Sequence, residues 1–355
     1  MGIWEIVRVG YHAFHRGRAV WGLDFSPDGR LLASAGDDGV WLWDLVRNEK
    51  ITALTGELSK SALFALKGTA VLTTGKGGLR RWPIQIRNAA SRETIRVGPP
   101  QVLELPIRDL WDCRACLDKE GQLVAIADRR HARAILWRGD RPAEPLMLGP
   151  HPGAHYVAFH PKSGWLATGT WRGDSVKVWD TTTGREIQEL PIGQDTQVAF
   201  SPDGQWLVTG GAGKYQFWRV GSWQEDLDLS INRESPSGLP GPMAFAPDGR
   251  LLALARSTLE VQLFHADTGR QIARLPSPSP QIISYLCFSP DGSQLAIATE
   301  AGTVELWDLR RIRQGLAELG LDWDLPPYPP AVPADDTGPL TVIVDDGNTG
   351  KKNTK

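Results

Sequence analysis

The sequence predicts an all-β fold built from seven copies of one small sheet, and three observations support this prediction. The segment from Phe25 to Asp44 alternates short apolar runs with tight turns, in which Pro27 fixes φ and Gly29 can adopt a positive φ. This turn then recurs as Phe200-Ser-Pro-Asp-Gly204, Phe245-Ala-Pro-Asp-Gly249 and Phe288-Ser-Pro-Asp-Gly292. Finally, an aromatic residue ends the third strand of every copy, at Trp43, Trp82, Trp137, Trp179, Trp218, Phe264 and Trp307.

These aromatic residues are spaced by 39, 55, 42, 39, 46 and 43 residues, which brackets a period of about 40–45 residues. Each copy is too small to bury both of its faces, so it must stack against its neighbours. Aspartate follows the closing tryptophan at Asp44, Asp180 and Asp308. On these residues the chain resembles the WD40 family from about Ile3 to Leu309. The resemblance implies a seven-bladed β-propeller over residues 1–309.

The strand expected to close the ring lies at the N-terminus. Ile3–Val9 alternates apolar and polar residues before the first copy, and no outer strand directly follows Asp308 in the seventh copy. Members of the WD40 family commonly complete the last blade with an N-terminal strand, so we expect Ile3–Val9 to complete blade 7. Closure would remove an open sheet edge. The other outer strands are predicted at Lys50–Leu54, Arg185–Leu190, Gln224–Leu229 and Gln271–Leu275.

Two segments exceed the length of their equivalents in other blades. We expect a loop around Asn88–Arg96 before the outer strand Gln101–Leu105 of blade 2. The second insertion, Asn232–Gly241, is rich in Ser, Pro and Gly and is predicted to join blades 5 and 6.

The pattern changes after the seventh copy. Ile312, Leu316 and Leu319 fall on one face of a predicted amphipathic helix over residues 310–320, with Gly320 at its end. The arginines at 310, 311 and 313 are interpreted as a solvated helix face. Residues 321–355 are predicted to form a Pro-rich extended tail, disordered apart from the apolar run Leu340–Val344.

Composition limits the classes of partner. The 355-residue chain has 39 Lys and Arg against 41 Asp and Glu, a net charge of −2, so it lacks the basic excess typical of nucleic-acid binding. Three cysteines do not indicate a disulfide framework. The N-terminus has no signal-peptide pattern, and no run of about 18 apolar residues predicts a membrane span. We therefore expect a cytoplasmic, monomeric propeller with neither nucleic acid nor membrane as partner.

The candidate metal and redox motifs favour structural roles. Cys113 and Cys116 have the spacing of a redox or half-zinc motif, but residues three apart on a strand point to opposite faces, and a second pair is missing. His155 and His160 are separated in the same way. The sequence therefore predicts no metal, no cofactor and no catalytic residue.

The family resemblance implies a hydrogen-bonded network inside each blade, linking His, Ser or Thr, Trp and Asp. In blade 1 the matching residues are His15 and Ser34, with Asp37 or Asp38 in the turn. Blade 4 offers His151, Thr168 and Asp174. We interpret these residues as structural. The same applies to the closing residues of the repeat, Trp43, Asp44, Trp82, Trp137, Trp179, Asp180, Trp218, Trp307 and Asp308.

Partners of WD40 propellers usually bind the top face, which inner-strand entries and second turns form. Exposed aromatic and charged side chains on one rim are typical of binding hot spots. The candidate partner-binding residues on this face are Trp21, Lys60, Trp111, Asp112, His155, Arg172, Thr196 and Ser284.

Seven repeats without a catalytic constellation indicate a non-enzymatic scaffold or sensor that binds a protein or peptide partner. One alternative is a lactonase-like propeller hydrolase with a metal in the central channel, for which Asp24, Asp112 and Asp195 are the scattered candidate ligands. Another is a regulatory propeller of a separate Ser/Thr kinase. The helix and the stretch from Asp322 to Pro330 resemble the C-terminal end of large bacterial WD40 proteins that are often fused to such kinases, although kinase motifs are absent here.

Overall fold

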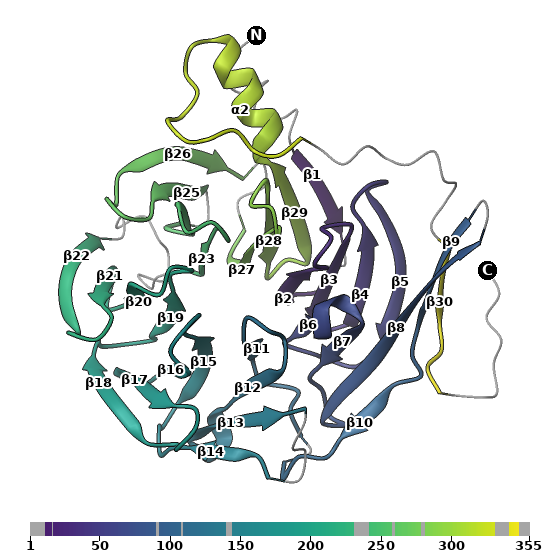
Figure 1. The fold of residues 1–355 in the computed structure, drawn as a ribbon, viewed down its shortest axis with the longest axis horizontal. Coiled ribbons are helices and arrows are strands. Elements are labelled where there is room, and N and C mark those ends of the chain that lie inside the picture. The colour runs from purple at the N-terminus through teal and green to yellow at the C-terminus, as the bar shows by residue number, and fades with distance from the viewer. Residues whose placement is uncertain are drawn as a thin grey trace.

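The computed structural model describes residues 11–15, 17–89, 92–107, 109–139, 144–230, 241–257, 260–277, 281–330 and 341–347. Within these ranges, seven sheets are arranged as blades around a common axis, with the first strand of each blade innermost (Figure 1). The predicted all-β, seven-bladed propeller is confirmed. All seven closing aromatic residues lie on the third strands of their blades, as predicted.

Six of the seven blades are four-stranded antiparallel sheets, and in five of these the four strands are consecutive in sequence. Blade 1 consists of β2 (Val20–Phe25), β3 (Leu31–Gly36), β4 (Gly39–Asp44) and β5 (Glu49–Thr55). Blade 3 consists of β11 (Ala115–Leu117), β12 (Leu123–Asp128), β13 (Arg133–Arg138) and β14 (Leu146–Leu148), with a 3₁₀ turn, η2 (Arg129–His131), between β12 and β13. Blade 4 consists of β15 (Ala154–Phe159), β16 (Trp165–Thr170), β17 (Ser175–Asp180) and β18 (Glu186–Pro191).

Blades 5 and 6 repeat the same order of strands. Blade 5 consists of β19 (Gln197–Phe200), β20 (Trp206–Gly211), β21 (Lys214–Arg219) and β22 (Gln224–Ser230). Blade 6 consists of β23 (Met243–Phe245), β24 (Leu251–Leu254), β25 (Glu260–His265) and β26 (Gln271–Pro276). The four simple outer strands predicted for blades 1, 4, 5 and 6 are therefore confirmed to within two residues at each end. The predicted insertion 232–241 lies outside the described residues except for Gly241.

Blade 7 is completed by the N-terminal part of the chain. It contains β27 (Ile283–Phe288), β28 (Gln294–Thr299) and β29 (Thr303–Asp308), and its outer strand is β1 (Tyr11–His15). β1 pairs antiparallel with β29, from Tyr11 opposite Trp307 to His15 opposite Thr303. Closure by an N-terminal strand is confirmed, but Ile3–Val9 was the wrong segment for this pairing. Ile3–Val9 itself lies outside the described residues.

Blade 2 departs most from the prediction. It contains β6 (Ala62–Ala65), β7 (Ala70–Thr73), β8 (Leu79–Ala89), β9 (Arg92–Val97) and β10 (Gln101–Leu103), with a 3₁₀ turn, η1 (Leu66–Gly68), between β6 and β7. β10 pairs with the first part of β8, as an outer strand should.

The predicted loop at Asn88–Arg96 is wrong, because β8 continues to Ala89 and forms a hairpin with β9. Ile95 and Val97 of β9 are buried and pack against blade 1. The segment therefore adds a strand to the sheet of blade 2, because its alternate apolar residues are buried on one face. A further strand, β30 (Thr341–Val344), pairs with the outer edge of β9.

The core is divided among the contacts between neighbouring blades. Separate clusters of buried apolar side chains lie between blades 1 and 2, 2 and 3, 3 and 4, 4 and 5, 5 and 6, 6 and 7, and 7 and 1. Each closing aromatic side chain belongs to one of them. Stacking of units that cannot bury both faces alone thus accounts for the ring.

The recurring turn is held by its own side chains. In blade 7, the Ser289 hydroxyl donates to Asp291 (2.7 Å) and accepts the amide of Gln294 (2.9 Å). Blades 1 and 5 repeat this arrangement with Ser26 and Ser201. In the degraded copy of blade 4, His160 takes the place of the serine. Its Nδ1 accepts the amides of Lys162 and Ser163 at 3.1 and 2.9 Å, so its Nε2–H donates to the Gly204 carbonyl at 2.9 Å.

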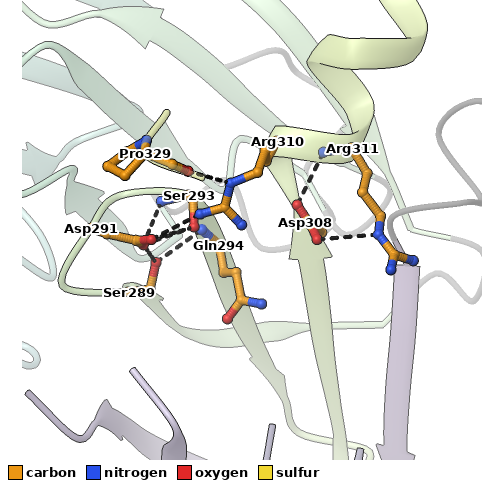
Figure 2. A network of polar contacts seen from close by, with 8 residues as sticks. All are labelled: Ser289, Asp291, Ser293, Gln294, Asp308, Arg310, Arg311 and Pro329. Carbon is orange, nitrogen blue, oxygen red and sulfur yellow. Dashed lines mark hydrogen bonds and ion pairs between the residues drawn. The ribbon is translucent and has the colours of Figure 1, made fainter. Parts of the chain in front are cut away.

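Aspartate after the closing tryptophan caps the backbone that follows it. Asp180 accepts the amides of Thr182 and Thr183 at 2.8 and 2.7 Å, and Asp44 does the same in blade 1. Asp308 accepts the amide of Arg311 at 3.0 Å and so caps the helix α2 (Leu309–Glu318) (Figure 2). The same residue type therefore ends a blade strand and starts a turn or a helix.

The helix and the segment 321–330 lie against the outside of blades 6 and 7. Leu309, Ile312 and Trp323 are buried in the cluster between these blades. Arg310 donates to the carboxylate of Asp291 (3.0 Å) and to the carbonyl of Pro329 (2.7 Å), which ties the segment to the turn of blade 7 (Figure 2). The helix is confirmed. Residues 321–330 pack against the blades, and Thr341–Val344, within the apolar run that was excepted from the predicted disorder, forms a strand. The boundaries 1–309, 310–320 and 321–355 remain a prediction.

The three arginines of the helix are not one solvated face. Arg311 is 57% exposed, whereas the side chain of Arg313 is only 8% exposed. Arg313 contacts both carboxylate oxygens of Asp322 at 2.9 and 3.0 Å. It also donates to the carbonyls of Pro326 and Leu325, both at 2.6 Å. The prediction of a solvated run is therefore wrong for Arg313, which holds the segment 321–330 to the helix.

Candidate functional site at the channel mouth

A pocket of about 110 Å³ lies where the inner strands of the blades converge. Each blade contributes one equivalent residue to the lining of this pocket, at or just before its inner strand. These residues are Leu23, Ala62, Arg114, Val157, Val198, Met243 and Leu286. Six of these are apolar and one is an arginine. Lys60 also lines the pocket, and the described lining residues include no Asp or Glu. The pocket is therefore bordered by two cations.

Lys60 is held over an aromatic ring at the rim. Its ammonium lies 3.4 Å from the centre of the Trp21 ring, and the Trp21 indole N–H donates to Asp37 at 2.6 Å. Burial, and next the charge of Arg114, lowers the pKa of Lys60 to about 8. A cation–π contact of this kind fixes both side chains without neutralising the ammonium.

Arg114 is a further candidate residue at this pocket, which the sequence analysis did not identify. Its Nη1 donates to the Trp21 carbonyl at 2.9 Å, and its guanidinium carbon lies 5.4 and 5.8 Å from the rings of Tyr156 and Tyr285. Its Nε is buried without a hydrogen-bond partner within the described part of the chain. A sequence signal existed, because this is the single charged residue at an inner-strand position that is apolar in the other six blades.

The blade 3 side of the rim is a pair of salt bridges. Arg129 contacts Asp112 at 2.6 Å, and Arg130 contacts Asp109 at 2.9 Å. Arg130 also lies over the ring of Trp111 at 4.9 Å. Trp111 and Asp112 each contact an arginine of the turn between β12 and β13, and their role as partner-binding residues stays a prediction.

Other candidate residues differ in how much side chain they present. Arg172 is exposed, and its amide donates to Asp195 at 2.6 Å. Ser284 is half-buried, and its hydroxyl donates to the Val20 carbonyl. Thr196 is 0% exposed and accepts the amide of Thr170 at 2.8 Å. Thr196 therefore has no side-chain surface for a partner, because its hydroxyl joins neighbouring strands.

His155 is also buried, with 8% of its surface exposed. Its ring packs edge-on against Tyr156 at 4.9 Å and lies 6.1 Å from Trp171. Burial, followed by the charge of Arg114, holds its pKa well below the ordinary value, so the imidazole is neutral near pH 7. The neutral ring of His155 packs beside the rim and offers little surface to a partner.

The network predicted inside blade 4 forms with a different fourth member. His151 contacts the Thr168 hydroxyl at 2.6 Å, and the Trp179 indole donates to that hydroxyl at 2.9 Å. Ser175, at 3.4 Å from His151, occupies the place we had assigned to Asp174. The carbonyl of Asp174 instead accepts the amides of Ile192 and Gly193.

The described residues include one bond of the network expected in blade 1. Trp43 donates to Ser34 at 2.8 Å. Asp37 and Asp38 accept from the indoles of Trp21 and Trp41, at 2.6 and 3.2 Å. The side chain of His15 lies outside the described residues. The tryptophan-to-hydroxyl bond alone recurs in blades 2 and 5, from Trp82 to Thr73 and from Trp218 to Thr209.

Carboxylates suited to a metal do not converge in the described ranges. Asp24 accepts the Phe64 amide at 2.6 Å, while Asp112 is paired with Arg129 and Asp195 binds the Arg172 amide. No group of three or more His, Cys, Asp or Glu side chains in the described ranges is placed to hold a metal ion. Cys113 and Cys116 are free thiols, and burial raises the pKa of each to about 12, which disfavours thiolate chemistry.

Asp24 should make stability depend on pH. Burial raises the pKa of its carboxyl from an ordinary value of 3.8 to about 7 in the folded protein. Between these values the folded state binds more protons than the unfolded state, so this group adds stability as pH falls from 8 to 4 and loses it as pH rises through 7. We expect the stability difference between wild type and Asp24→Asn to shift in favour of wild type on acidification.

Urea unfolding of both proteins at pH 8, 6 and 4.5 measures this difference. Asparagine keeps an oxygen for the Phe64 amide and cannot ionise, which isolates the titration. A constant difference across this range would contradict the raised pKa of Asp24.

Comparison with known proteins identifies the repeat. The family model described as WD domain, G-beta repeat matches residues 8–44, 148–180, 192–219 and 269–308, which correspond to blade segments of the structure. A WD repeat-containing protein of Synechocystis is 24% identical over 205 residues, 57% of this chain and 57% of that protein. The fold is a seven-bladed propeller, and its repeats are WD40 repeats. The chain is a WD40-repeat protein.

Two further relatives have descriptive names. Transcription initiation factor TFIID subunit 5 of Caenorhabditis elegans is 26% identical over 248 residues, 64% of this chain and 37% of that protein. Serine-threonine kinase receptor-associated protein of Dictyostelium discoideum is 24% identical over 136 residues, 37% of this chain and 43% of that protein. The matched regions thus cover less than two thirds of each of these relatives.

No helix in the described ranges is long and apolar enough to cross a membrane.

Proposed function

We propose that this propeller is a non-enzymatic scaffold or sensor that binds a protein or peptide partner at the mouth of its central channel, and that the partner inserts an acidic side chain there. The observation that carries this proposal is the pocket bordered by Lys60 and Arg114 and by no carboxylate. We include in the proposal a monomeric propeller and a cytoplasmic location.

An inserted carboxylate would meet donors that are already in position. Arg114 has a buried Nε without a partner in the described residues, and Lys60 keeps its charge while it lies over Trp21. The small pocket admits a side chain and not a folded element. Charge-assisted hydrogen bonds in such a partly desolvated site are stronger than neutral ones. The rim residues Trp111 and Arg172 would add contact area around the inserted group.

The relatives support the general class. One is named as a subunit of a transcription initiation factor and another as a receptor-associated protein, and both names describe proteins that assemble with others. A regulatory role toward a separate kinase stays an alternative prediction within the same class. A propeller hydrolase would need convergent carboxylates, and the separate engagements of Asp24, Asp112 and Asp195 do not favour it.

Replacing Lys60 by methionine tests the proposal. Methionine keeps an unbranched chain over Trp21 but removes the charge, so we expect hexaglutamate peptide to bind the Lys60→Met variant at least tenfold more weakly than wild type. Fluorescence anisotropy of a labelled peptide at low salt gives both affinities. Lys119→Met is the matched control, because Lys119 is exposed in the turn between β11 and β12 and its loss should leave binding unchanged.

A hexaglutamine peptide separates charge from backbone binding and should not bind. Affinity capture with wild type, Lys60→Met and Lys119→Met then asks whether a cellular partner uses the same pocket. Equal binding of hexaglutamate by all three proteins would overturn the insertion of an acidic side chain at this pocket. A captured partner that is retained by Lys60→Met would move the site away from the channel mouth.

A further inference from the structure

The chain's own C-terminal strand occupies the outer edge of blade 2. β30 runs parallel to β9, with Thr341 opposite Thr94, Val342 opposite Ile95, Ile343 opposite Arg96 and Val344 opposite Val97. Figure 1 shows β30 beside the long hairpin of β8 and β9, away from the central axis. The β9 edge thus accepts a strand that is distant in sequence.

Side chains of this strand are alternately partly buried and exposed from Val342 to Val344. Val342 and Val344 pack against the cluster between blades 1 and 2, which includes Ile95 and Val97. Ile343 points away, with 49% of its surface exposed. The edge therefore selects β-branched residues at two alternate positions and accepts any residue between them.

The end of the strand is fixed by a close backbone approach. The Asp345 amide donates to the Val97 carbonyl at 2.9 Å, and its carboxylate lies 3.6 Å from Arg96. Gly98 has a φ of +97°, and a Cβ added to it would lie 2.1 Å from the Asp345 carbonyl oxygen. Any side chain at position 98 would therefore disturb the path of the docked strand.

Several features make this strand exchangeable. β30 has only four residues and pairs on one side alone. Parallel pairing is slightly less stable per residue than antiparallel pairing, and short edge elements open more readily than core strands. Blade 2 keeps β10 as a separate partner of β8, so release of β30 removes no strand from the ring of blades.

We propose that the β9 edge is a strand-addition site for a partner segment with two β-branched residues at alternate positions followed by an acidic residue, and that β30 occupies this site in cis as its competitor. Release of the tail would open the site, and binding in trans would replace the same backbone bonds and the same contact with Arg96. This site is separate from the channel mouth and does not depend on the proposed function.

The test uses the full-length chain and a labelled peptide with the sequence of residues 340–346. The double substitution Val342→Asp and Val344→Asp releases the tail without shortening the protein. We expect the released variant to bind the peptide saturably, and wild type to bind it at least tenfold more weakly, because an attached competitor acts at millimolar effective concentration. Fluorescence anisotropy measures both affinities.

Peptide variants keep the test independent of folding. A peptide carrying the same two aspartates should not bind, whereas replacing the exposed Ile343 by alanine should change affinity less than twofold. In the released protein, Gly98→Ala should weaken binding at least tenfold, with circular dichroism to verify the fold. Absence of binding at 1 mM, or equal binding of the aspartate peptide, would overturn the proposal. A concentration-dependent dimer of wild type that the peptide does not dissociate would also overturn it, in favour of strand exchange between copies.

Discussion

Arg313→Ala is expected to lower the free energy of unfolding by about 3 kcal/mol, because the substitution removes a buried guanidinium that donates to several backbone carbonyls at once. The Arg313 guanidinium contacts both oxygens of Asp322 and three backbone carbonyls, of Trp323, Leu325 and Pro326. Its loss leaves these carbonyls without the guanidinium donor, whereas the exposed carboxylate of Asp322 keeps the Trp323 amide.

The effect should reach the propeller itself. Trp323 is buried against blades 6 and 7, in the same cluster as Ile312 and Trp307. When Arg313 no longer holds the segment 321–330, Trp323 loses its place over the blade that closes the ring. We therefore expect amides of residues 321–330 to exchange rapidly with solvent and those of β29 to lose protection.

Urea unfolding and hydrogen exchange measure the two effects, and the helix provides its own control. Arg311 lies two residues away, is 57% exposed and has one ion pair with Asp308 at 3.6 Å. Exposed pairs of this kind contribute about 0–1 kcal/mol. A similar loss of stability in Arg313→Ala and Arg311→Ala would refute a special role for Arg313.

The propeller could be predicted because its determinants repeat. The aromatic residue that ends each third strand must enter a cluster between blades. The spacing of these residues is therefore kept even in the copies whose turns are degraded. His160 illustrates this tolerance, since it replaces a serine and still satisfies the turn through Nδ1.

The parts that were wrong depend on contacts between segments distant in sequence. Arg313 falls on the buried face of α2 with Leu309 and Ile312. Its partners come from residues 322–326, whose packing the local pattern does not reveal. The closing strand lies a few residues beyond Ile3–Val9, at Tyr11–His15, because strand register follows the partner β29 and not the alternation alone. The repeat could not predict the β8–β9 hairpin, because no other blade in the described residues carries one.

At the channel mouth, the sequence proposed candidate residues but could not predict how exposed their side chains are. Position along the inner strand identified Trp21, Lys60 and Asp112 as neighbours of the mouth. It could not show that Thr196 turns into a buried network with Thr170. Arg114 was not predicted because the candidate residues were taken from the rim, at Asp112 in blade 3, whereas the pocket is lined two residues further along the chain.

Thr168→Val is the second substitution with a large expected effect, a loss of about 3 kcal/mol in the free energy of unfolding. Valine nearly conserves the volume of threonine but removes a hydroxyl that is 0% exposed. That hydroxyl contacts both the imidazole of His151 and the indole of Trp179. Two buried polar groups lose a partner, and each unsatisfied group costs about 1–3 kcal/mol.

Thr209→Val is the matched control, because it removes the same group at the equivalent place in blade 5. The Thr209 hydroxyl is also 0% exposed and accepts the indole of Trp218 at 2.9 Å. Its loss leaves a single donor unsatisfied, so we expect a cost of about 1–2 kcal/mol. Chemical denaturation at pH 7 compares the two variants. A larger cost at Thr209 than at Thr168 would mean that the His151 contact adds no stability. In that case blade 4 would be held by its packing and its tryptophan bond alone, like the blades that lack the histidine.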